Sequence, residues 1–184
     1  DAAMAVYTDV TAEDLTAFLA GYDLGEVLSY KGIAEGVENS NFLLHTSRGY
    51  FILTLYEKRV AAGDLPFFLG LMEHLALRGL TCPQPVKNRA GTAQGMLAGR
   101  PAAIVSLLDG MWPRRIEPQH CSGIGGALAQ LHRAAADFGP RRANALSLEG
   151  WRKLYDSCAA RADEIAPGLA QELGEELDAQ TRLG

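Results

Sequence analysis

One segment decides how this chain folds: Gly32-Ile33-Ala34-Glu35-Gly36-Val37-Glu38-Asn39-Ser40-Asn41-Phe42-Leu43-Leu44. Two glycines and several small polar residues stand between apolar runs at residues 27–30 and 41–45. This pattern is typical of a glycine-containing loop between two strands. Glycine has no Cβ and accepts the backbone angles with which consecutive N–H groups surround a phosphate. A long ordinary hairpin turn has the same pattern, so the interpretation depends on the elements around it.

The predicted elements around this loop alternate strands with one helix and then become helical. Thr11 is a good N-cap for a first helix, and apolar residues at i, i+3, i+4 and i+7 predict a second helix inserted between strands. We expect strands at residues 27–30, 41–46, 50–56, 92–97 and 102–108, the inserted helix from 64 to about 78, and helices after 118 and from 148 to 183, with a break near 167–168. The fold class is therefore α+β, with five antiparallel strands and one inserted helix before a helical part.

The best candidate boundary is the turn at Asp109-Gly110, where strand-forming sequence gives way to helical sequence. We expect a small lobe at residues 4–108, and a hinge with an incomplete helical lobe at 109–184. Met4 is expected to be the natural start, with residues 1–3 as an unrelated extension.

Composition indicates a globular cytoplasmic protein. The chain has 184 residues, 48% of them hydrophobic, and a formal net charge of −5, which argues against nucleic-acid binding. No apolar run is long enough to span a membrane, and no signal peptide is visible. The three cysteines, Cys82, Cys121 and Cys158, form no Cys-x-x-Cys motif, which is typical of a reducing compartment. The four histidines have no metal-ligand spacing. No feature of the sequence indicates an oligomeric state.

Four segments, in this order, carry a family resemblance: Gly36-Val37-Glu38-Asn39-Ser40-Asn41, Tyr50-Phe51-Ile52-Leu53-Thr54-Leu55-Tyr56-Glu57, Gly79-Leu80-Thr81-Cys82-Pro83-Gln84-Pro85 and Gly125-Gly126-Ala127-Leu128-Ala129-Gln130-Leu131-His132. Together with the helix between the second and third of them, they resemble bacterial homoserine kinases. These enzymes form part of the aminoglycoside-phosphotransferase branch of the protein-kinase-like fold. The resemblance extends from about Thr8 to Gly150.

The resemblance implies an ATP-dependent phosphotransferase. Its substrate would be a small molecule, L-homoserine, whose hydroxyl receives the γ-phosphate of ATP in threonine biosynthesis, with Mg²⁺ as cofactor. Two alternatives stay open. One is another small-molecule kinase of the same fold, acting on choline, an aminoglycoside or a sugar. The other is a non-catalytic nucleotide-binding module.

The resemblance also implies which residues hold ATP. The glycine loop would cover the triphosphate, an apolar group would enclose adenine, and a hinge after the fifth strand would read the adenine edge through its backbone. The expected ATP-binding residues are Gly32, Ile33, Gly36, Val37, Asn39, Ser40, Asn41, Ile52, Thr54, Glu73, Ser106, Leu108 and Asp109. Ordinary alternatives exist for several of them: sheet packing for the isoleucines and Val37, and turn formation for the polar loop residues and Asp109.

Two departures from the family pattern affect the site. Thr54 stands where related folds carry a cation on the third strand, and Lys58 lies about 13 Å farther along an extended strand. Without that cation, Glu73 is either the matching helix glutamate or a solvated charge. The catalytic motif His-x-Asp-x-x-x-x-Asn is also absent, since His132 is followed by Arg133 and two alanines. We therefore expect the catalytic base and the metal ligands beyond residue 184, and no activity from this chain alone.

Overall fold

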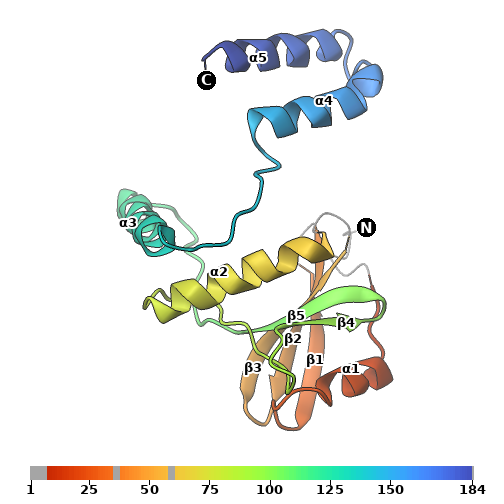
Figure 1. Ribbon diagram of the computed structural model, residues 1–184, viewed down its shortest axis with the longest axis vertical. Helices are drawn as coiled ribbons and strands as arrows, with labels where there is room; N and C mark the ends of the chain where they lie inside the picture. Colours follow the sequence, from red (N-terminus) through yellow and green to blue (C-terminus); the bar gives the residue numbers. More distant parts are fainter. Residues whose placement is uncertain (1–7, 35–37, 58–60, 184) are drawn as a thin grey trace. The chain divides into compact units, whose positions relative to one another are not determined.

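A five-stranded antiparallel sheet forms the core of the N-terminal part of the chain (Figure 1). The computed structural model describes residues 8–34, 38–57 and 61–183. The strands are β1 (Val27–Ile33), β2 (Asn39–Thr46), β3 (Gly49–Tyr56), β4 (Gln94–Leu97) and β5 (Arg100–Ser106), in the spatial order β1-β2-β3-β5-β4. The helices are α1 (Ala12–Leu19), α2 (Leu65–Leu77), α3 (Pro118–Ala135), α4 (Leu148–Ala162) and α5 (Leu169–Leu183), and a short 3-10 turn, η1 (Ala62–Asp64), precedes α2.

The predicted fold class is confirmed, with differences at strand ends. β2 begins at Asn39, not at residue 41, because Asn39 still pairs with Tyr56 across the sheet. The prediction that the fifth strand spans 102–108 was wrong at both ends. Its pairing begins at Arg100, opposite Leu97, and ends at Ser106. Alternation of side chains cannot locate such ends, because the last paired residues are fixed by the partner strand.

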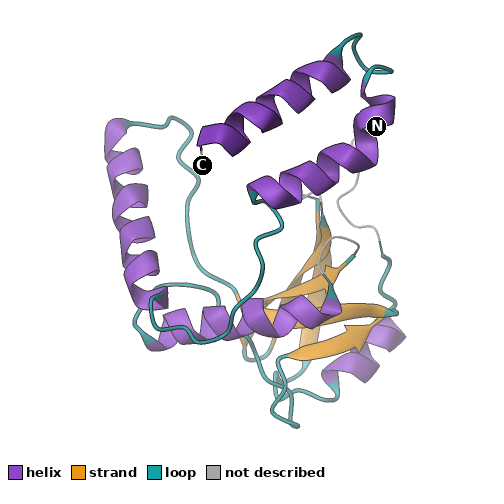
Figure 2. Cartoon of the chain, turned by 45° about the horizontal axis from the view of Figure 1, so that its top comes forward, coloured by secondary structure: helices purple, strands orange, loops and turns teal. Residues whose placement is uncertain are grey.

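The chain divides into two compact units, Asp1–Pro140 and Arg141–Gly184. The predicted lobe boundary at residues 108 and 109 stays a prediction, because it separates a nucleotide-binding part from a helical part, whereas the two units reflect packing alone. Figure 2 shows that all strands lie in the first unit and that the second consists of helices and connecting loops.

Local signals explain where several helices begin and end. The Thr11 hydroxyl accepts a hydrogen bond from the Asp14 N–H at 3.1 Å and so caps α1. After α2 the chain reverses at Gly79, whose φ of 81° is a left-handed conformation that side chains disfavour. Between α4 and α5, Gly168 has the same role at φ 82°. The predicted break near residues 167–168 is therefore confirmed.

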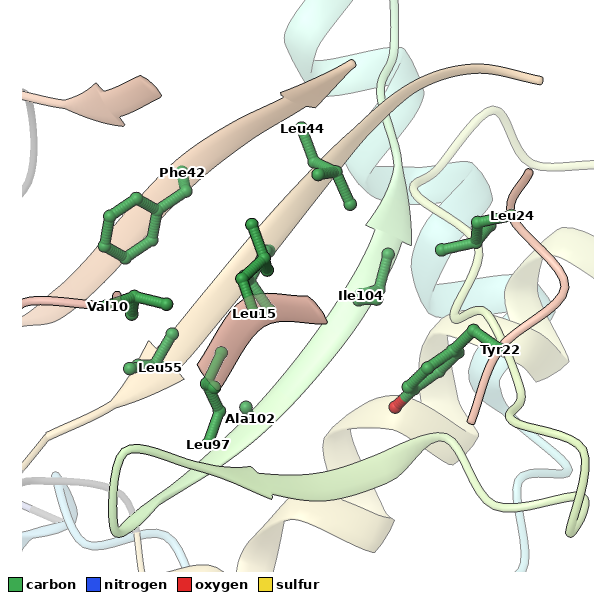
Figure 3. Packing of buried hydrophobic residues seen from close by; sticks show 11 residues of the cluster. Val10, Leu15, Tyr22, Leu24, Phe42, Leu44, Leu55, Leu97, Ala102 and Ile104 are labelled. Atoms are coloured by element: carbon green, nitrogen blue, oxygen red, sulfur yellow. The ribbon is translucent and has the colours of Figure 1, made fainter. Parts of the chain in front are cut away.

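The main core lies between one face of the sheet and α1 (Figure 3). Leu44 on β2, Leu53 and Leu55 on β3 and Ile104 on β5 are fully buried there, and Leu15 of α1 packs against the same cluster. Burying one such side chain contributes roughly 1.5–3 kcal/mol. The strict alternation of buried and half-buried residues along β2 follows from this one-sided packing.

The opposite face of the sheet is covered only in part, by α2. Leu65 and Leu69 of α2 pack on Ala103 of β5, with Tyr56 and Ala93 at the margin. This helix therefore covers the β5 side of the face. The side chains of β1, β2 and β3 that point to the same face stay half-buried or exposed, which leaves an accessible surface next to the glycine-containing loop.

The residues just after α3 contact α2 and its C-cap residue Arg78 through several aromatic and polar contacts, among them those of His74 with Asp137 and Phe138. Phe138 meets Phe67 at 5.5 Å between ring centroids, and Arg78 forms an ion pair with Asp137. None of the helices in the described ranges is long and apolar enough to cross a bilayer.

The second unit is a pair of helices joined by polar contacts. The Tyr155 hydroxyl of α4 donates to the Ala170 carbonyl of α5 at 3.0 Å, and Arg152 pairs with Asp178 at 2.5 Å. Both helices are predicted by the sequence, and both are present.

Candidate functional site

The accessible sheet face next to the glycine-containing loop carries a row of predicted site residues. Ile33 of β1 lies directly opposite Asn41 of β2, which in turn lies opposite Thr54 of β3. Directly paired residues point to the same face of a sheet. Thr54 is paired with Ala103, on which α2 packs, so all three side chains belong to the face that α2 covers only in part. All three are half-buried.

Asn41 and Thr54 are joined by their side chains. The Thr54 hydroxyl donates a hydrogen bond to Asn41 Oδ1 at 2.8 Å. The pair Ile33–Asn41 is also the last one between β1 and β2, so the loop leaves β1 and enters β2 beside this hydrogen bond.

A second row on the same face is mainly apolar. Ile52 of β3 lies between Leu43 of β2 and Val105 of β5, and Lys31 of β1 lies opposite Leu43. Sequence reasoning identified Ile52 but missed Leu43 and Val105, which enlarge the apolar surface. Period-two alternation from Asn41 and Ile52 would have found Leu43, since Leu43 lies two residues after Asn41 and directly opposite Ile52.

Ser40 points to the opposite face of the sheet. Its side chain is fully buried, its hydroxyl donates to Glu57 Oε1 at 2.5 Å, and it accepts the Thr8 N–H at 3.1 Å. The Glu57 side chain is only 5% exposed and pairs with Arg100 at 3.1 Å. The structure therefore does not bring the Ser40 hydroxyl together with the Asn41 carboxamide and the Thr54 hydroxyl.

Asn39 lies on the Asn41 side of β2, one rung beyond it, opposite Tyr56. Within the described ranges, its Oδ1 is buried and has no hydrogen-bond partner. Burial raises the pKa of the Tyr56 hydroxyl, which keeps that phenol neutral. This end of the face is thus polar but carries no charge on either side chain.

Glu73 on α2 forms an ion pair with Lys87. Lys87 lies 2.5 Å from the Glu73 carboxylate, and both side chains are about half exposed. Such a pair contributes about 0–1 kcal/mol. Lys87 follows the extended segment in which Pro85 bridges to Val105 of β5, so its approach to α2 results from the tertiary fold. Sequence reasoning did not identify Lys87 as this partner.

A cavity of about 520 Å³ adjoins Glu73 between α2 and β4. Leu69, Ala93 and Met96 are among the residues that line it. Of the predicted site residues, only Glu73 contributes to its wall, so this cavity is separate from the face formed by β1, β2 and β3.

The predicted hinge follows β5. Ser106 is engaged with Gln84, since its N–H donates to the Gln84 carbonyl at 2.9 Å and its hydroxyl accepts the Gln84 N–H at 2.9 Å. The Leu107 N–H donates to the Tyr50 carbonyl at 3.3 Å. Leu108 and Asp109 are exposed, and the described residues provide no hydrogen-bond partner for the Leu108 backbone. Among the described hinge residues, the backbone groups of Leu108 and Asp109 are therefore accessible.

The Asn41–Thr54 pair and the predicted hinge lie at two ends of the same accessible face. Ala103, opposite Thr54, precedes Ser106 by three residues, which spans about 10 Å along a strand. The apolar row around Ile52 lies between them. Gly32 is half-buried on β1 and pairs with Phe42. The predicted residues Gly36 and Val37 lie outside the described residues, as does Lys58.

Metal ligation is not apparent among the described side chains. Within the described ranges, no group of three or more His, Cys, Asp or Glu residues is arranged to hold an ion.

Homoserine kinases from several bacteria are similar to this chain. The protein of Afipia carboxidovorans is 66% identical over 174 residues, which cover 95% of this chain and 53% of the relative. That of Bradyrhizobium diazoefficiens is 65% identical over 175 residues, covering 95% and 54%. The chain thus spans about half the length of the curated relatives it matches.

Solved structures of phosphotransferases share the fold. A spectinomycin phosphotransferase in complex with ADP and spectinomycin matches with a TM-score of 0.67 at 12% identity, over 96% of this chain and 58% of that one. An aminoglycoside phosphotransferase from Alicyclobacillus acidocaldarius matches with a TM-score of 0.54 at 13% identity, over 93% and 53%. At such identities the likeness concerns the fold alone. The profile of the phosphotransferase enzyme family matches residues 29–183, and the chain therefore belongs to that family.

Proposed function

We propose that the protein to which this chain belongs is a homoserine kinase, which transfers the γ-phosphate of ATP to the side-chain hydroxyl of L-homoserine. The observation that carries this proposal is the identity of 60–66% to several homoserine kinases over 95% or more of the chain. The resulting reaction would serve threonine biosynthesis in the cytoplasm. The absence of disulfides at Cys82, Cys121 and Cys158 is compatible with a reducing compartment.

The geometry supports a role for this chain in holding ATP. In our proposal, adenine lies on the apolar row formed by Leu43, Ile52 and Val105, with Ile33 at the margin. The backbone of Leu108 reads the adenine edge, and Asp109 meets the ribose. A ligand in this orientation places its phosphates under the glycine-containing loop, whose end carries Asn39 and Asn41. The separation of about 10 Å along the strands leaves room for the sugar and the phosphates.

Phosphoryl transfer needs more than this face provides. It requires neutralisation of phosphate charge, an in-line hydroxyl and a positioned base. Mg²⁺ supplies charge neutralisation in phosphotransferases generally, and it belongs to the proposal without assigned ligands. The base and those ligands are proposed to lie in the part of the protein beyond residue 184. The roles of Ser40, Glu73 and Ser106 in ATP binding stay predictions, because the structure gives each of them another partner.

A direct assay tests the proposed substrate. The full-length protein is purified and ADP release is coupled to NADH oxidation with L-homoserine, choline, spectinomycin and a hexose in parallel. We expect turnover with L-homoserine at least about tenfold above that with any other acceptor, and ³¹P NMR should detect a phosphate monoester of homoserine. Preferential turnover of another acceptor would replace the substrate. ATP binding without turnover of any acceptor would favour a non-catalytic module.

The same assay, applied to the 184-residue chain, tests whether catalysis needs residues beyond 184. The 184-residue chain alone should release no ADP above background, because it has no catalytic loop. Robust homoserine phosphorylation by this chain would contradict the assignment of the base to residues beyond 184.

A further inference from the structure

The hydrogen bond between Thr54 and Asn41 fixes the orientation of one amide on the accessible sheet face. The Thr54 hydroxyl donates to Asn41 Oδ1 at 2.8 Å. Threonine is β-branched and therefore restricted at χ1, so its hydroxyl is held in place by the strand. With Oδ1 engaged, the carboxamide presents Nδ2 and its two N–H donors on the other side. No acceptor for these donors occurs among the described side chains and backbone groups.

The position of the free donors matches the place where phosphates are proposed to lie. Asn41 is paired with Ile33, the last residue of β1 before the loop. Phosphate oxygens accept hydrogen bonds and donate none at full ionisation, so a site for them needs donors. Along the described parts of β1, β2 and β3, the lysine on this face is Lys31, which lies one rung farther from the loop, about 6.6 Å away.

We propose that Thr54 is a positioning residue, which holds the Asn41 carboxamide so that its N–H groups donate to a phosphate of the bound nucleotide. This inference rests on the proposed function, since it specifies how the same face recognises ATP. Asn41 contacts the phosphate in this arrangement, whereas Thr54 acts only by orienting Asn41. A neutral amide then serves where the described residues of β1, β2 and β3 beside Asn41 include no cation.

Substitutions at both residues separate this role from sheet stability. Thr54→Val keeps the shape of the side chain and removes the donor, so the amide is free to rotate. Thr54→Ser restores a hydroxyl. Asn41→Asp still accepts the Thr54 hydrogen bond but has no N–H donor and places a negative charge near the phosphates. Thr46→Val is the matched control, because Thr46 is a buried, hydrogen-bonded threonine at the hairpin end of β2.

The experiment compares ATP with adenosine by isothermal titration calorimetry on the full-length protein. Adenosine lacks phosphates and reports the integrity of the apolar surface. We expect Thr54→Val to weaken ATP about tenfold, Asn41→Asp about 100-fold, and Thr54→Ser less than about threefold. Adenosine affinity should change less than about twofold in all three variants. Thr46→Val should leave the ratio of ATP affinity to adenosine affinity unchanged.

Two other results would each refute a different proposal. Equal weakening of ATP and adenosine by Thr54→Val, or no weakening of ATP, would show that the Thr54–Asn41 pair only stabilises the sheet, whereas the kinase assignment would stand. An unsubstituted protein that binds no ATP would refute the proposed function, and this inference with it.

Discussion

Ser40→Ala is the substitution that separates a structural role for this residue from ATP binding. The Ser40 hydroxyl is fully buried, donates to Glu57 at 2.5 Å and accepts the Thr8 N–H at 3.1 Å. A hydrogen bond to a charged group contributes about 1.5–3 kcal/mol and a neutral one about 0.5–1.5 kcal/mol. Alanine leaves almost no cavity, so the lost hydrogen bonds dominate. We expect the free energy of unfolding to fall by about 2–4 kcal/mol.

Urea denaturation followed by far-UV circular dichroism measures this change. Ser29→Ala on β1 is the control, because Ser29 is exposed and its loss should change stability by less than about 0.5 kcal/mol. A double-mutant cycle with Glu57→Gln should give a coupling energy of about 1–2 kcal/mol. An unchanged unfolding midpoint in Ser40→Ala, together with a loss of ATP affinity, would refute the structural role and restore Ser40 as a phosphate ligand.

The remaining predictions concern titratable groups. Burial raises the pKa of Tyr22 above 10.0, so above about pH 10 the unfolded chain holds fewer protons than the folded chain and the free energy of unfolding falls. Tyr22→Phe should reduce this alkaline loss, measured as the urea midpoint, and should leave the midpoint at about pH 7 unchanged or higher, because the Tyr22 hydroxyl has no partner among the described residues. An alkaline fall of the urea midpoint that is equally steep in Tyr22→Phe and in the unsubstituted protein would contradict this. Partial burial raises the pKa of the Cys82 thiol, so at about pH 8 iodoacetamide should modify the exposed Cys121 and Cys158 several-fold faster than Cys82, as followed by mass spectrometry; equal rates at all three would contradict the half-buried position of Cys82.

Much of the fold follows from local sequence. Thr11 predicts the start of α1, and the apolar spacing from Leu65 predicts α2, because caps and periodicity act within a few residues. Alternation along β3 predicts which of its residues share a face. These features depend on covalent geometry and on one side of each element being buried, so neighbouring residues suffice to reveal them.

The candidate site was predicted less well, for a reason that Ser40 and Asn41 illustrate. Adjacent residues on a strand point to opposite faces, so only one of the two can reach the accessible face. The sequence favours Ser40 and Asn41 equally as the residue that reaches this face. The packing of α1 against one face and α2 against the other decides which hydroxyl or amide is buried. Alternation from Asn41 would have placed Leu43 on the accessible face, whereas its position directly opposite Ile52 depends on pairing between strands.

Partners distant in the chain were beyond sequence reasoning altogether. Glu73 was expected to be either the helix glutamate of the family pattern or a solvated charge, yet it pairs with Lys87, which follows the segment that bridges to β5. Glu57 and Arg100 similarly meet across 43 residues. Charges carry no periodicity that identifies a partner, since ion pairs form wherever the fold brings two side chains together.

The sequence by itself determined the order of strands and helices, the glycine-containing loop and the resemblance to phosphotransferases, because these are recorded in short segments whose residues interact locally. Only the tertiary structure decided which side of the sheet is accessible, that Thr54 holds Asn41 there, and that Ser40 is turned away. Those outcomes depend on strand register and on which helix covers which face, and both are set by the burial of apolar surface across the whole sheet.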